Sequence, residues 1–134
     1  MAKYTLYAYV DGSDLHDVAD HLIARFNAFI ESRAWVSPRV LFVNQVRELE
    51  EGVDPEFLPD WELGLNIDLP ERSQRHPRWF EDVRATVSFL GELHQETGRD
   101  FVVGLGDNEA GFGEDYMFVD TSSPDVEELR PMLE

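Results

Sequence analysis

The sequence predicts an α+β protein with a mostly antiparallel sheet, and three observations support this fold class. Apolar residues at every second position mark strands, apolar residues three and four apart mark helices, and the two patterns follow one another as β-α-β-β-α-β-β-α. This order matches a ferredoxin-like (split βαβ) two-layer sandwich with two helices on one face, an extra C-terminal hairpin strand and a short C-terminal helix. The length of 134 residues suits one core, so we expect a single acidic α+β domain over residues 1–134.

The first strand and helix occupy the N-terminal quarter of the chain. In the stretch from Tyr4 to Val10, every second residue is aliphatic, which predicts a strand with one face in the core. Ser13 follows in a turn sequence and is a good N-cap. Apolar residues then recur at helical spacing, which predicts an amphipathic helix over residues 14–32.

Two further strands are expected before the second helix. Residues 39–46 predict one strand, and residues 61–69 alternate apolar and polar side chains, as is typical of a half-buried strand. The acidic segment between them is longer than a hairpin loop, and we expect a helical turn at residues 48–51.

The second half repeats the pattern of a helix followed by strands. Pro77 suits the first position of a helix that should end at Gly98. Residues 100–106 and 116–119 predict two strands joined by a glycine-rich loop, and a short last helix is expected after the cap Ser123.

The acidic residues are concentrated in two segments of the chain. The net charge is −17; residues 48–71 hold nine acids and no base, and residues 100–134 hold ten acids and one base, Arg130. Such a field repels nucleic acids and anionic membranes and attracts a basic protein surface. The absence of cysteine excludes a disulfide scaffold and thiolate zinc sites, and it agrees with a cytoplasmic location. The N-terminal stretch is too short and too regularly alternating for a signal peptide or a membrane span.

Tyr7 and Tyr9 are expected on the sheet face that the two helices leave open. RNA-recognition-motif sheets also present stacking aromatics, but the RNP1 pattern is absent here. Glu62 and Asp68 would stand where phosphates approach, so we expect no RNA binding. These tyrosines could instead pack under the last helix or against a second copy of the chain.

The glycine-rich stretch "GLGDNEAGFGEDYMFVD", residues 104–120, fits no ligand motif. The third glycine of a dinucleotide-binding fingerprint is replaced by Glu109, and the oxygen ligands do not have EF-hand spacing. Two of its glycines, Gly111 and Gly113, suit positive φ angles in a wide hairpin turn. We therefore expect neither a bound metal nor a cofactor here.

Two clusters of titratable residues remain. In "HDVADH", His16 and His21 diverge around a helix, so local pairing with Asp20 and Asp17 is expected instead of a zinc site. The only basic cluster, "RSQRHPR" at residues 72–78, could bind an anion, but we expect it to pair with the acidic segment 48–71.

Three functional hypotheses follow from these features. The first is a non-catalytic acidic binding protein, of the inhibitor or immunity type, that covers a basic protein surface. The second is a ferredoxin-like domain that self-associates, as a homodimer, or binds a small molecule through its open sheet face. The third is a metal-dependent enzyme that uses clustered carboxylates, although no catalytic motif is present. The residues expected to contact a partner are Asp107, Glu109, Glu114, Asp115, Glu62, Asp68, Tyr7 and Tyr9.

Overall fold

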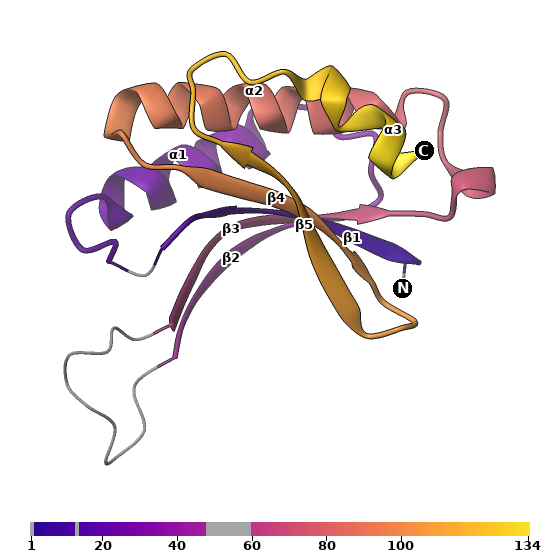
Figure 1. Ribbon diagram of the computed structural model, residues 1–134, viewed down its shortest axis with the longest axis horizontal. Helices are drawn as coiled ribbons and strands as arrows, with labels where there is room; N and C mark the ends of the chain where they lie inside the picture. The colour runs from indigo at the N-terminus through magenta and orange to yellow at the C-terminus, as the bar shows by residue number, and fades with distance from the viewer. Residues whose placement is uncertain (1, 13, 48–59) are drawn as a thin grey trace.

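The computed structural model describes residues 2–12, 14–47 and 60–134. Strands and helices follow one another along these ranges in the predicted order (Figure 1). The strands are β1 (Tyr4–Val10), β2 (Val40–Arg47), β3 (Asp60–Leu69), β4 (Phe101–Asp107) and β5 (Phe112–Val119). The α-helices are α1 (Ala19–Glu31), α2 (Trp79–Thr97) and α3 (Arg130–Leu133), with short 3-10 turns η1 (Arg72–Gln74) and η2 (Val126–Glu128). The turn expected at residues 48–51 lies outside the described residues.

The five strands form one open sheet in the order β2-β3-β1-β4-β5, and each neighbouring pair is antiparallel. The α+β class and the antiparallel sheet are therefore confirmed. Strand β1, in the centre, pairs with β3 on one side and with β4 on the other. The central strand is thus flanked by strands that come much later in the sequence.

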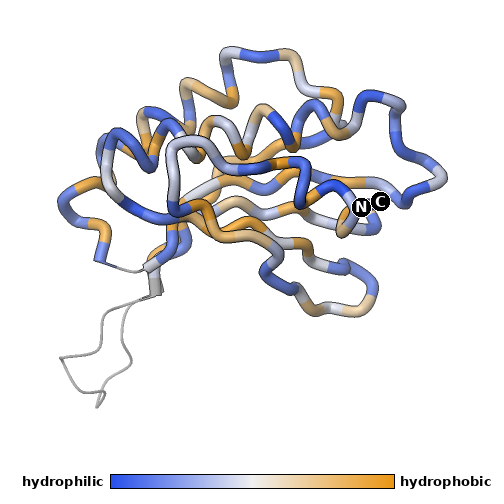
Figure 2. Tube along the Cα trace, turned by 45° about the horizontal axis from the view of Figure 1, so that its top comes forward, coloured by the Kyte–Doolittle hydropathy of each residue, from blue (hydrophilic) through white to orange (hydrophobic). Residues whose placement is uncertain are grey.

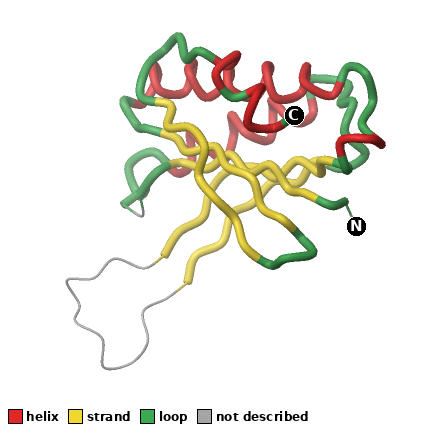
Figure 3. The backbone as a smooth tube through the Cα atoms, turned by 45° about the vertical axis from the view of Figure 1, so that its right-hand side comes forward, coloured by secondary structure: helices red, strands yellow, loops and turns green. Residues whose placement is uncertain are grey.

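All three helices lie on the same face of the sheet (Figures 1 and 3). The C-terminal segment with η2 and α3 packs beside α2 in this layer. The last helix therefore does not cover the opposite face, which was one arrangement that the sequence left open. We call the face turned away from the helices the open sheet face.

The core lies between the sheet and the helices. On β3 the predicted alternation is confirmed, because Leu63, Leu65 and Ile67 are almost completely buried. Hydrophobic and hydrophilic residues alternate along the strands and helices (Figure 2). Leu133, the penultimate residue, is also buried, so the last turn contributes to this core.

Helix α1 begins later than predicted, at Ala19 instead of residue 14. Residues before it form a turn in which the amide of Ala19 donates to the carbonyl of Leu15 at 2.7 Å. The predicted local pairs are also wrong, since Asp17 binds Arg99 and His21 binds Glu96. These partners come from the end of α2 and the residues after it, so contacts between distant segments replace pairing along one helix.

Helix α2 ends as predicted. Gly98 has a φ of 73°, and its amide donates to the carbonyl of His94 at 2.8 Å. This left-handed cap needs glycine because a Cβ is unfavourable there. The helix begins at Trp79, two residues after the predicted Pro77.

Residues 104–120 form a tight hairpin instead of a wide loop. β5 begins at Phe112, four residues earlier than the predicted 116, so Gly113 lies inside a strand and has no positive φ. Gly111 does have a positive φ, 80°, as expected for the turn. The final helical segment is capped by Asp125, whose side chain accepts from the Glu127 amide, instead of by Ser123.

Candidate functional site

The open sheet face carries a pair of tyrosines at its centre. Tyr7 and Tyr9 alternate with buried residues on β1, so both project away from the helices. Their rings stack with centroids 5.5 Å apart and planes inclined by 26°. The expected position of the two tyrosines is therefore confirmed.

Glycines on the neighbouring strands leave room for both tyrosine rings. A Cβ at Gly104, on β4, would overlap the Tyr7 hydroxyl and lie 2.5 Å from the carbonyl oxygen of Glu114. A Cβ at Gly64, on β3, would lie 2.6 Å from Cδ1 of Tyr9. Glycine inside a strand commonly marks such a close approach. The sequence showed these glycines, but only the register shows which rings cover them.

The phenol groups are held by hydrogen bonds to the neighbouring strands. The Tyr7 hydroxyl donates to a carboxylate oxygen of Asp115, and the Tyr9 hydroxyl donates to Oδ1 of Asn66 at 2.6 Å. Burial and the bond to Asp115 raise the pKa of Tyr7, while burial and the nearby charge of Glu62 raise the pKa of Tyr9. Both tyrosines are therefore neutral at physiological pH, and hydrogen bonds to neighbouring strands hold them in place. We call this pair the tyrosine platform.

Three of the six predicted carboxylates share this face with the platform. Glu62 and Asp68 alternate with buried residues of β3, and Asp115 lies opposite Gly104 in the β4–β5 ladder. Glu114 is on the other face, because it pairs with the core residue Leu105.

Most described arginines form ion pairs away from the open sheet face. Arg25, Arg33 and Arg84 bind carboxylates of α2 or η2 at 2.7–3.4 Å, within the helix layer. The remaining ion pairs of arginine in the described ranges are Arg78 with Glu81, Arg99 with Asp17 and Arg130 with Glu134. The carboxylates beside the platform thus have no cationic partner within 4 Å among the described side chains. Arg39 lies beside Asp68, and its backbone carbonyl accepts from the Asp68 amide, but its guanidinium forms no ion pair with that carboxylate.

The other two predicted carboxylates belong to the turn between β4 and β5. Asp107 accepts hydrogen bonds from the amides of Glu109 and Ala110, both at 3.0 Å, so it shapes the turn. Lys3 bonds to Glu109 at 2.9 Å and lies 3.5 Å from Asp107. The Ala110 and Glu109 amides, with Lys3, lower the pKa of Asp107. These carboxylates are engaged within the chain and do not form an isolated acidic tip.

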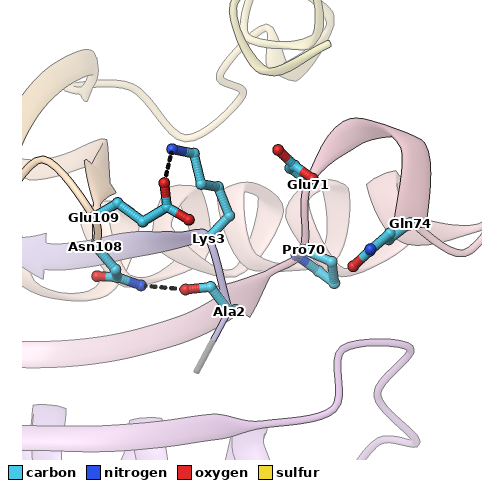
Figure 4. Close-up of a pocket in the computed structure, with 7 residues that line it drawn as sticks. All are labelled: Ala2, Lys3, Pro70, Glu71, Gln74, Asn108 and Glu109. Carbon is cyan, nitrogen blue, oxygen red and sulfur yellow. Dashed lines mark hydrogen bonds and ion pairs between the residues drawn. The ribbon is translucent and has the colours of Figure 1, made fainter.

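This turn borders a polar cavity of about 240 Å³ (Figure 4). On one side Lys3 meets Glu109, and Asn108 donates to the carbonyl of Ala2 at 2.9 Å. Glu71 and Gln74 line the opposite side. The charges near Lys3 already compensate one another, so this cavity offers a ligand no free cation.

The basic cluster does not pair with acidic side chains of residues 61–71, the described part of the predicted segment. Arg75 donates to the backbone carbonyls of Pro70 and Leu133, and Arg78 pairs with Glu81 one turn along α2. Neither arginine forms an ion pair with a described side chain of residues 61–71, and the rest of the predicted segment lies outside the described residues.

Exposed large apolar side chains occur at both edges of the sheet, and the sequence analysis did not identify them. Leu41 on β2 is 41% exposed, and Phe118 on β5 is 57% exposed. By register, Leu41 pairs with Asn66 and Phe118 with Val102, which places both on the open sheet face. They extend the platform with apolar surface toward each edge.

Across the described ranges, no three His, Asp or Glu side chains gather as a group that could hold a metal ion. None of the helices in this part of the chain combines the length and apolar character that crossing a membrane requires. Comparison with models of protein families, with curated proteins and with solved structures finds no match.

Proposed function

We propose that this protein is a non-catalytic binding protein whose open sheet face takes an arginine-bearing basic segment of a partner protein. The observation that carries this proposal is the tyrosine platform, bordered by Glu62, Asp68 and Asp115, which form no ion pair with a described side chain. An arginine guanidinium stacks on aromatic faces and also forms bidentate hydrogen bonds with carboxylates. Both interactions are available at this face at once.

Preorganisation supports the same proposal. The hydrogen bonds of Tyr7 and Tyr9 and the glycines beneath them fix the rings before any partner arrives. A rigid surface loses less conformational entropy on binding than a mobile one. The net charge of −17 would speed the approach of a cationic partner, especially at low salt. Inhibitor or immunity-type proteins that cover a basic surface are the class we propose.

We also propose that the fold is ferredoxin-like. Support comes from the strand order, in which β3 lies between β1 and β2 while β1 lies between β3 and β4. This is the split βαβ arrangement, here extended by β5.

Self-association through the same face is the second candidate, and the exposure of Leu41 and Phe118 favours it. A twofold dimer, however, would bring the open-face carboxylates of both copies into one interface, where like charges repel. Sedimentation at low and high salt distinguishes the two. A dimer that forms or strengthens at high salt would favour self-association, whereas a monomer at low and high salt favours a basic partner.

The proposal is tested with a short fluorescein-labelled peptide of alternating glycine and arginine, measured by anisotropy. Removing one charge beside the platform with Glu62→Gln, or the ring with Tyr9→Leu, should weaken binding roughly two- to fivefold. The matched control is Asp20→Asn, which removes one exposed charge from α1. Equal weakening by Asp20→Asn would reveal attraction to net charge alone and contradict the proposal.

A further inference from the structure

A second site lies in the helix layer, at the start of α2 and separate from the open sheet face. A cavity of about 260 Å³ is enclosed by α2, the end of β3 and residues 36–38. Its walls are mainly apolar and include Val36, Ile67, Leu69, Trp79 and Val83. This volume is close to the lower end of ligand pockets, about 300–1,000 Å³. The cavity therefore suits a single ring or a short aliphatic chain.

A neighbouring cavity of about 370 Å³ is polar where the first is apolar. It shares Val36 and His76 with the first cavity, and its lining also includes the guanidinium-bearing residues Arg33 and Arg78. A ligand whose apolar body occupies the first cavity would thus have its head group beside two arginines. Glu81 also lines this second cavity and Asp82 lines the first, so each arginine stands beside a carboxylate and binds it through one terminal nitrogen.

The cavity wall is preorganised by a buried carboxylate. Asp82 is 2% exposed and accepts from the amides of Val36 at 3.1 Å and Ser37 at 2.7 Å. It also accepts from Arg33 at 2.9 Å. These bonds hold residues 36 and 37 against α2, and they leave Asp82 neutralised instead of presenting a free charge to a ligand.

Hydrogen-bond donors exceed acceptors around the polar cavity. Arg33 uses one terminal nitrogen on Asp82, which leaves its second terminal nitrogen as a donor, because its Nε is fully buried and out of a ligand's reach. Arg78 uses one terminal nitrogen on Glu81, although a guanidinium carries more donors than one carboxylate uses. Nδ1 of His76 accepts from the Arg78 amide, so the neutral ring carries its proton on Nε2. The donors that remain call for an acceptor-rich, anionic head group.

We propose that these two cavities bind a small amphipathic monocarboxylate, with its apolar body against Val83 and Trp79 and its carboxylate between Arg33 and Arg78. A neutral molecule would make weaker hydrogen bonds with the arginine donors, and a cation would compete with Arg33 and Arg78 for carboxylates that they already bind. A multiply charged phosphate would be opposed most strongly by the acidic chain as a whole. A single carboxylate combines the required acceptors with the smallest such repulsion.

The test uses 3-phenylpropionate as the probe and calorimetry together with amide chemical shifts as readouts. We expect one-to-one binding with shifts at Val36, Val83 and their neighbours, and about tenfold weaker binding of the neutral 3-phenylpropanamide. Acetate, which lacks the apolar body, should not compete. Equal affinity for the acid and the amide, or shifts elsewhere, would overturn the proposal.

Two arginine variants with the same change in charge locate the head group. Arg78→Gln should weaken the carboxylate about fivefold and leave the amide unaffected. Arg84→Gln, which replaces another exposed and ion-paired arginine, should change the affinity for neither the carboxylate nor the amide. Val36→Trp, which fills the space shared by both cavities, should abolish binding. If Arg84→Gln weakens binding as much as Arg78→Gln, or if Val36→Trp folds and still binds, the assigned site is wrong.

Discussion

Substituting Gly104 by alanine should displace the tyrosine platform, because this glycine is where Tyr7 rests on β4. The new Cβ would overlap the Tyr7 hydroxyl and lie 2.5 Å from the carbonyl oxygen of Glu114. The tyrosine can swing away, but doing so breaks its hydrogen bond to Asp115. The backbone carbonyl can yield only if β5 shifts.

The expected cost combines two effects. Overpacking a fitted position costs about 1–3 kcal/mol, and losing a hydrogen bond to a charged group costs about 1.5–3 kcal/mol. Alanine regains roughly 0.5–1 kcal/mol because glycine is unfavourable within a strand. Partial relaxation makes the sum smaller than the extremes, so Gly104→Ala should lower the free energy of unfolding by about 2–4 kcal/mol.

Urea denaturation measures this cost, and Gly106→Ala is the matched control. Gly106 lies on the same strand and the same face, yet its Cβ would meet nothing closer than the Thr5 carbonyl oxygen at 3.8 Å. We expect Gly106→Ala to be neutral or slightly stabilising. In a Tyr7→Ala background the cost of Gly104→Ala should shrink, since one of its two clashes is gone. Equal stability of the Gly104→Ala and Gly106→Ala proteins would refute the close packing of Tyr7 on β4.

Three further predictions concern the core, the helix layer and the platform. Leu65→Asp should cost several kcal/mol by burying an unpaired charge, and a thermal midpoint within about a degree of the wild type would contradict the position of β3. Asp82→Ala should lower the free energy of unfolding in urea by about 3–5 kcal/mol, because it leaves Arg33 without its carboxylate. A loss below about 1 kcal/mol, which is typical of exposed ion pairs, would mean that this contact is dispensable. Because the pKa values of Tyr7 and Tyr9 are raised, their contribution to the free energy of unfolding should be fully present below about pH 10. This contribution should decline as the pH rises through their folded-state pKa values. Absorbance titration should show late-ionising tyrosines that Tyr7→Phe and Tyr9→Phe remove, and unchanged titration curves would argue against a buried platform.

The strands and helix ends that depend on local pattern could be predicted from the sequence. Alternation located the strands at residues 4–10 and 61–69 within a residue, and glycine located the end of α2 at Gly98. These signals work because side-chain direction in a strand and a positive φ at a cap are properties of short segments. Local pattern does not show that Asp17, in the turn before α1, pairs with Arg99, 82 residues away.

The candidate site was only partly predictable for the same reason. Placing Tyr7 and Tyr9 on the open face needed alternation alone, whereas their support by Gly64 and Gly104 depends on the register between strands. Similarly, composition could not show that Asp107 shapes a turn with its own backbone. Such roles depend on contacts that the tertiary fold creates.

Chemical-shift mapping of the glycine-arginine peptide on the isotopically labelled protein tests the proposed function most directly. We expect the largest amide shifts on β1, β3 and β4 around Tyr7, Tyr9, Gly64 and Gly104, and smaller shifts at the same peptide concentration in the Tyr9→Leu protein. Shifts that concentrate on α1 and α2, or that persist unchanged in Tyr9→Leu, would contradict binding at the open sheet face.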